Sequence, residues 1–414
     1  MFRQFMTCTA SLALTVALVP SPAAAQSAAL SSTSSGSSAS GSVQPGSADT
    51  GSTAREGLAA LARTLIAGSS ATSAARSGSS LTTLLSSMSL LGSSEFSLPA
   101  GQVYRSPNWP KPVDESITTS EIVSKVVEDG DRLERWTVAS PSMARNVEVQ
   151  IMRAPDPATP APMLYLLDGV DAQRNSDWLR LGGAGEFFAA ENVTLVMPVE
   201  ARASMYSDWV ADDPAVGRHM WETFLVDELM PLLDADPDLN FNGHRGIGGI
   251  SMGAAGAVHL ANTNPELFDG VFGISGCYST LDPVGRQTAQ LTLATRGADA
   301  ENMWGPFGSE EWIRHDTTGN PAGLGSMSVY LSSSDGQYLF DPDRNYGGLP
   351  VETMFISTLL EQGSYACTVA LDEAMRAAGM NHHVVEYTGA GVHDWNTFRP
   401  QLAPAWETIR DSLY

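Results

Sequence analysis

Gly249-Ile250-Ser251-Met252-Gly253 is the stretch that decides the fold, and it has the pattern G-x-S-x-G. Residues 244–250, ahead of the serine, are apolar and glycine-rich, which favours a buried strand, and residues 254–261, behind it, are small and helix-forming. A strand, a sharp turn and a helix around such a serine form a nucleophile elbow, in which small neighbours allow a strained backbone. The alternative is a glycine-rich turn without chemistry. We expect Ser251 to be a catalytic nucleophile whose Oγ is held clear of the sheet, at the end of the strand over residues 244–250.

Outward from this motif, apolar strand-like segments alternate with segments of helical spacing. This alternation predicts an α/β fold with a mostly parallel sheet and no internal repeat. The turn Asp129-Gly130 is expected to join two antiparallel strands, and the helix over residues 352–378 is expected to break near Gly363. The expected strands cover 121–128, 132–139, 145–153, 163–167, 193–199, 244–250, 270–275, 328–331 and 383–387, and the other expected helices cover 221–233, 254–261 and 398–413.

The N-terminal part of the chain has the composition of an export signal followed by an extended segment. Met1-Phe2-Arg3 is positively charged, an apolar run follows, and Ala23-Ala24-Ala25 supplies a small-residue cleavage site. Because the apolar run is too short to span a bilayer, we predict a secretory signal peptide over residues 1–25. Residues 26–98 are rich in Ser, Gly, Ala and Thr, so they are expected to form a disordered stalk. The folded domain is then residues 99–414.

Charge and cysteine content restrict the class of protein further. The formal net charge is −23, which argues against nucleic acid or an anionic surface as a partner. Cys8 lies in the predicted signal peptide, so Cys277 and Cys367 are the cysteines of the mature chain. In a secreted protein such a pair is expected to form a disulfide, although two buried free thiols are the alternative.

A serine nucleophile needs a base, and in an elbow fold the order along the chain is serine, acid, histidine. His393 follows the last expected strand in a glycine-rich loop, so we expect it to be the base. No histidine has the spacing of a metal site, and we expect neither a metal nor a cofactor. The remaining histidines, all expected to be structural or exposed, are His219, His244, His259, His315, His382 and His383.

The acid that orients the histidine has two candidates in the sequence. Asp335 follows the strand expected at 328–331, and Glu361 lies in the long helical segment; the residues alone do not decide between them. The oxyanion of the reaction also needs donors. We expect the backbone N–H groups of Met252, after the nucleophile, and of Val170, after an earlier central strand, to supply them.

Several motifs, in the same order over residues 162–406, resemble the secreted mycolyltransferases of the antigen 85 type. The cysteine pair and the serine-rich extension are more similar to the corynebacterial-type relatives. The motifs are Tyr165-Leu166-Leu167-Asp168-Gly169, Val196-Met197-Pro198-Val199, Tyr206-Ser207-Asp208-Trp209, Trp221-Glu222-Thr223-Phe224-Leu225, the elbow itself and His393-Asp394-Trp395.

The resemblance implies an α/β-hydrolase fold with helices on both faces of the sheet and a Ser-Glu-His triad. It favours Glu361 as the acid, because Leu360-Glu361-Gln362-Gly363-Ser364 matches the context of the family's glutamate. It also implies oxyanion donors at Val170 and Met252. The family's sugar-contacting residues correspond to Asp168, Ser251, Asp282, His393 and Trp395. The mycobacterial proteins have a sugar-binding arginine where this chain has Asp171.

The activity that the resemblance implies is transfer of a mycolyl group from trehalose monomycolate, through an acyl-enzyme, to an acceptor hydroxyl. The acceptor could be another trehalose mycolate, an arabinogalactan terminus or a protein hydroxyl. We therefore expect a secreted protein of the cell envelope with peripheral envelope association. Two other functions compete: a secreted carboxylesterase or lipase with the same triad, and a catalytically silent relative that binds carbohydrate.

Overall fold

The computed structural model describes residues 106–130, 132–337 and 351–414, all of which belong to one unit of the chain. The expected signal peptide and stalk lie outside these described residues. Within the described part of the chain, no helix combines the length and the apolar character that a membrane crossing requires.

Nine strands in the described residues form one mixed sheet with the order β1-β2-β3-β5-β4-β6-β7-β8-β9. From β5 to β9 every neighbouring pair is parallel, whereas β1, β2 and β3 add an antiparallel edge. The central strands are fully buried, as their continuous apolar runs predict. The strands are β1 (Glu121–Asp129), β2 (Leu133–Ser140), β3 (Arg145–Met152), β4 (Ala161–Leu167), β5 (Thr194–Pro198), β6 (Phe241–Ile250), β7 (Gly270–Ile274), β8 (Ser328–Ser333) and β9 (Val384–Tyr387).

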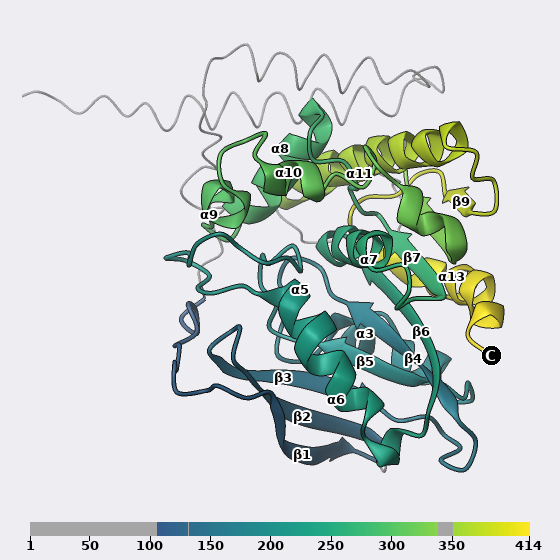
Figure 1. The fold of residues 1–414 in the computed structure, drawn as a ribbon. Coiled ribbons are helices and arrows are strands. Elements are labelled where there is room, and N and C mark those ends of the chain that lie inside the picture. The colour runs from purple at the N-terminus through teal and green to yellow at the C-terminus, as the bar shows by residue number, and fades with distance from the viewer. Residues whose placement is uncertain (1–105, 131, 338–350) are drawn as a thin grey trace, which may run out of the picture. The chain divides into compact units, whose positions relative to one another are not determined.

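Helices cover both faces of this sheet (Figure 1). On one face, α5 (Trp221–Thr223), α6 (Met230–Asp234) and α7 (Met252–Thr263) pack with the end of α11 (Val351–Ala377) in the largest hydrophobic cluster. On the other face, α3 (Asp177–Arg180), α4 (Ala184–Phe187) and α13 (Leu402–Ile409) pack in a second cluster. Parallel strands with helices on both faces are the arrangement of an α/β-hydrolase fold, as predicted.

Three helical expectations differ from the structure. Helix α11 is not broken near Gly363 but runs on for 27 residues. Gly363 has a packing role instead, since a β-carbon there would lie 3.0 Å from Oγ1 of Thr288. A π-helical segment, Phe224–Leu229, lies between α5 and α6. The last helix is interrupted, with α12 (Trp395–Phe398) separated from α13 by a short 3₁₀ turn.

Residues 275–327, between β7 and β8, form a helical insertion that the sequence analysis did not foresee. It contains α8 (Pro283–Ala294), α9 (Ala300–Trp304) and α10 (Glu310–Arg314), which lie beside the start of α11 in Figure 1. The disulfide predicted between Cys277 and Cys367 is present and joins the first turn of the insertion to α11. It therefore connects two segments that are 90 residues apart in sequence.

Candidate active site

Ser251 lies at the sharp turn between β6 and α7, as the G-x-S-x-G pattern predicts. Its backbone has φ 54° and ψ −121°, a conformation that costs a non-glycine residue about 1–3 kcal/mol. Both glycines of the motif are required by close packing. A β-carbon on Gly249 would lie 2.2 Å from the carbonyl of Gly253, and one on Gly253 would lie 2.3 Å from the carbonyl oxygen of Leu167. The turn can therefore form only with glycine at both places.

Two histidine contacts connect Ser251 to a buried carboxylate. His393 Nε2 lies 2.6 Å from Ser251 Oγ, and His393 Nδ1 lies 2.7 Å from Oε2 of Glu361. The backbone N–H of His393 donates to the carbonyl of Ser357 on α11, and Phe398 packs edge-on against the ring. These contacts fix the loop after β9, so the imidazole stays between the serine and the carboxylate.

Glu361 is fully buried in α11 and is oriented by hydroxyl and amide donors. Its Oε1 accepts hydrogen bonds from Ser275 Oγ at 2.8 Å, Ser333 Oγ at 3.1 Å and the backbone N–H of Ser334 at 2.7 Å. The other oxygen is left to face His393. The sequence analysis missed these three residues, although the serine run after β8 is the signal that could have found two of them.

Asp335, the reserve candidate for the acid, is not in contact with His393 in the described residues. Its carboxylate accepts the backbone N–H of Gln337, and its own N–H donates to the carbonyl of Gly389. Burial, followed by the nearby charge of Glu361, raises the pKa of Asp335. The geometry thus brings Glu361, and not Asp335, to the histidine.

The expected oxyanion donors lie on either side of Ser251. Met252 is the first residue of α7, where backbone N–H groups have no acceptor within the helix. Val170 follows Gly169, at which a β-carbon would lie 3.7 Å from Cβ of Ser251. In the part of the chain that the structure describes, the N–H groups of Val170 and Met252 donate to no protein acceptor. Both are therefore available to an anionic oxygen next to the serine.

Asp168 is completely buried at the end of β4. Its Oδ1 accepts from Ser176 Oγ and from the backbone N–H of Asp177, while its Oδ2 has no hydrogen-bond partner in the described structure. Burial, together with the charge of Asp177, raises the pKa of Asp168 from 3.8 to about 8. The carboxyl group is therefore mostly protonated at neutral pH and lies below the protein surface.

The other two expected sugar contacts have structural partners of their own. Asp282 caps α8: it accepts the N–H groups of Val284 and Gly285 and contacts the hydroxyl of Ser279. Trp395, at the start of α12, is half-buried and packs edge-on against Trp178 with ring centroids 5.5 Å apart. Both side chains stabilise the loops that surround the serine.

Asp171, where the resemblance led us to expect an arginine, is paired with two arginines in the structure. Its Oδ1 lies 2.9 Å from Arg202 and 2.7 Å from Nε of Arg296, at the end of α8. Positive charge is therefore present near the loop after β4, although it is supplied from other parts of the sequence.

A narrow pocket opens beside Ser251 and His393 and extends under α8. Its free volume is only about 30 Å³, which is room for about one or two water molecules. Cys277 and Thr280 line one wall, and Thr288 and Thr292 of α8 line another. The hydroxyls of Thr288 and Thr292 donate to backbone carbonyls of α8. Neither hydroxyl therefore needs a ligand to accept its hydrogen bond. The enclosed space next to the serine is small.

Comparison with known proteins identifies the family. The family model described as "Putative esterase" matches residues 140–409, which include Ser251, Glu361 and His393. The chain belongs to the esterase family. Within the family it is similar to proteins named "Diacylglycerol acyltransferase/mycolyltransferase". The one named Ag85A from Mycobacterium leprae is 29% identical over 279 residues, covering 65% of this chain and 80% of the relative.

Two further comparisons agree with this. The relative named Ag85B from Mycobacterium leprae is 28% identical, with 68% of this chain and 84% of the relative covered. The crystal structure of Mycobacterium tuberculosis MPT51 (FbpC1) superposes with a TM-score of 0.57 at 24% identity, covering 69% of this chain and 100% of the crystallised chain. That structural likeness confirms the fold alone.

Proposed function

We propose that this esterase-family protein is a serine acyltransferase that moves a mycolyl group from trehalose monomycolate to an acceptor hydroxyl. The observation that carries the proposal is the continuous contact from Ser251 through His393 to the buried Glu361. A strained elbow serine, an oriented imidazole and a buried carboxylate are the parts that nucleophilic acyl transfer needs. The names of the relatives include mycolyl transfer, beside acyl transfer to diacylglycerol, and so support an acyltransferase.

In the first half of the reaction, Ser251 Oγ attacks the ester carbonyl of the donor while its proton passes to His393 Nε2. The oxyanion accepts hydrogen bonds from the N–H groups of Val170 and Met252. When the carbonyl re-forms, the bond to the trehalose oxygen breaks, and His393 returns the proton to that oxygen. Glu361 keeps Nδ1 protonated and stabilises the imidazolium. The product is a mycolyl ester on Ser251.

In the second half, an acceptor hydroxyl attacks the ester carbonyl of the acyl-enzyme and gives its proton to His393. Ser251 leaves and recovers that proton. The candidate acceptors are a second trehalose monomycolate, an arabinogalactan terminus and a protein hydroxyl. Transfer requires that the acceptor hydroxyl reach the acyl-enzyme more readily than water does.

Asp168, Asp282 and Trp395 are our candidate sugar contacts. Trp395 is half-buried, so part of its ring is accessible to a sugar. Asp168 and Asp282 would have to exchange present contacts for sugar hydroxyls, because Asp168 is buried and Asp282 caps α8. We further propose that the protein acts in the cell envelope after export by its N-terminal segment, with residues 26–98 as a stalk.

The product mixture tests this function. Purified mature protein is incubated with trehalose monomycolate, and trehalose dimycolate and free mycolic acid are quantified, with Ser251→Ala as the control. We expect dimycolate from the intact protein and a rate lower by roughly 10⁴–10⁶-fold in the variant. Free mycolic acid alone would identify a hydrolase instead. If neither product forms, the acceptor is of another kind or the protein binds carbohydrate without catalysis.

A further inference from the structure

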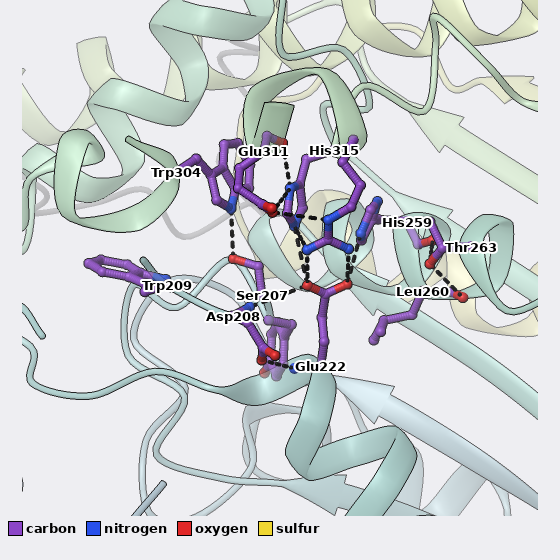
Figure 2. A network of polar contacts seen from close by, with 12 residues as sticks. Ser207, Asp208, Trp209, Glu222, His259, Leu260, Thr263, Trp304, Glu311 and His315 are labelled. Carbon is purple, nitrogen blue, oxygen red and sulfur yellow. Dashed lines mark hydrogen bonds and ion pairs between the residues drawn. The ribbon is translucent and has the colours of Figure 1, made fainter. Parts of the chain in front are cut away.

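Glu222, in the motif Trp221-Glu222-Thr223-Phe224-Leu225, is the centre of a half-buried polar network outside the proposed catalytic residues (Figure 2). Its carboxylate accepts a bidentate pair of hydrogen bonds from Arg314. Nη1 donates to Oε1 at 2.9 Å, and Nη2 donates to Oε2 at 2.6 Å. His259 Nε2 lies 3.0 Å from Oε1, and His315 Nε2 lies 3.4 Å from Oε2. The network therefore joins α5 to α7 and to the end of α10.

The two histidines extend this contact by stacking. The rings of His259 and His315 lie 4.3 Å apart, and His315 stacks in turn on Trp304 of α9 at 4.2 Å. Trp304 Nε1 donates to the hydroxyl of Ser207, in the motif that precedes the Glu222 motif. Motifs of the main domain thus hold the insertion at both α9 and α10.

Arg314 supplies the positive charge that pairs with the carboxylate of Glu222. The ligand atoms of Glu222, His259 and His315 all lie within 4.8 Å of one another, which is a spacing that a metal ion could use. The guanidinium of Arg314 already provides the cation there. Although burial opposes it, hydrogen bonds from Arg314, His259 and His315 hold the pKa of Glu222 well below its usual range. Removing Arg314 would leave the half-buried carboxylate of Glu222 without its main counter-charge.

Helix α10 is connected in turn to the wall of the serine pocket. Thr280, which lines that pocket, donates its hydroxyl to the carbonyl of Trp312 at 2.6 Å and its backbone N–H to Asp316 at 3.1 Å. Trp312 and Asp316 flank Arg314 in sequence. The other end of the same wall is held by the disulfide at Cys277. A displacement of α10 would therefore shift Thr280 relative to Ser251.

We propose that Glu222 and Arg314 form a positioning pair that fixes Thr280, in the lining of the pocket beside Ser251, and thereby limits the access of water to the acyl-enzyme. This inference rests on the acyl-enzyme of the proposed function but not on the identity of its acyl group. Loosening the pair admits water to the serine ester, so the acyl-enzyme is hydrolysed faster. The Glu222–Arg314 pair then affects the ratio of acyl transfer to hydrolysis.

The lifetime of the acyl-enzyme tests the pair. The protein is acylated with p-nitrophenyl butyrate, the ester is removed rapidly, and decay of the butyryl adduct on Ser251 is followed by mass spectrometry. Decay is first-order, so its rate constant does not depend on how much of a variant has been acylated. Arg314→Met removes the pair, and Arg314→Lys keeps the charge but loses the bidentate geometry. Arg174→Met is the matched control, since Arg174 makes a similar pair with Glu148 outside the insertion, at 2.8 and 3.0 Å.

We expect the butyryl half-life to fall about tenfold or more in Arg314→Met, less in Arg314→Lys, and to stay unchanged in Arg174→Met. Equal half-lives in the wild type and both Arg314 variants would overturn the inference. Absence of any adduct on wild-type Ser251 would overturn both the inference and the acyl-enzyme step. If no dimycolate forms but the butyryl half-life falls in the Arg314 variants, the proposed substrate is wrong and the role of the Glu222–Arg314 pair is supported.

Discussion

At Glu361, three donors fix one carboxylate oxygen so that the other can face His393. Asp335 has no such contact with the histidine in the described residues. We therefore expect Glu361→Gln to lower kcat for p-nitrophenyl butyrate by about 10³–10⁴-fold, because the amide favours the wrong imidazole tautomer. Asp335→Asn should change kcat less than about threefold. Comparable losses in both variants would show that the acid has been misassigned.

At Asp168, burial has a consequence for stability. The pKa of about 8 in the folded state lies above the value of 3.8 expected for an exposed carboxyl group, so the folded protein binds more protons than the unfolded chain between these values. The contribution of Asp168 to the free energy of unfolding therefore decreases as the pH rises from about 4 to about 8. Asp168→Asn removes this titration and should reduce the loss of stability between pH 5 and pH 8 by about 4 kcal/mol. Urea unfolding at the two pH values measures the difference. An identical pH dependence in the variant would mean that Asp168 is ionised in the fold.

Residues near the elbow could be predicted from the sequence because the turn is local. Ser251, Gly249 and Gly253 are within five positions, and the packing that requires the glycines follows from the turn itself. His393 was found through its place after the last strand. Glu361 could not be chosen over Asp335 from the residues alone, because the choice depends on which helix face meets the end of β8. The resemblance favoured Glu361, and the structure brings that residue to His393.

At the scale of elements, the disulfide joins the start of the insertion to α11, the helix that carries Glu361. Closing a loop with a separation of 90 residues restricts the unfolded chain strongly. We expect the double variant Cys277→Ser/Cys367→Ser to lose about 2–5 kcal/mol of unfolding free energy in a denaturant titration. A reducing agent should lower wild-type stability by a similar amount and leave the double variant unaffected. An effect of the reductant on the double variant would point to another cause.

The elements that sequence reasoning placed well are those with continuous apolar runs, such as β4 and β5. The insertion was missed because its short helices have little periodicity of their own: they are stabilised by contacts such as Arg314 with Glu222, which lie 92 residues apart. Gly363 was misinterpreted for a similar reason. Glycine disfavours a helix by about 1 kcal/mol, but close packing against Thr288 of α8 favours glycine at that site.

At the scale of the whole molecule, the proposed chemistry lies entirely within residues 140–409, the part that matches the esterase family. We therefore expect a variant without residues 26–98 to keep kcat/KM for p-nitrophenyl butyrate within about twofold of the full mature chain. The same variant should lose association with the cell envelope if the segment is a tether. Cell fractionation measures the second effect. A large loss of turnover would instead place part of the active site in the N-terminal segment.

The sequence predicted both parts of the sheet. Asp129-Gly130 indicates the hairpin of the antiparallel edge, and the alternation of later strands with helices indicates the parallel part. The sequence alone does not show the narrow pocket beside Ser251, because its walls depend on how α8 and α11 pack together.

The central claim is that Ser251 carries the mycolyl group between donor and acceptor. The most direct test mixes the protein with trehalose monomycolate, quenches the reaction in acid within its first turnovers, and maps the acylated peptide by mass spectrometry. We predict a mycolyl ester on Ser251, released trehalose in at least an equal amount, and loss of the adduct when more acceptor is added. Product formed without an adduct, or an adduct on another residue that persists in Ser251→Ala, would contradict it.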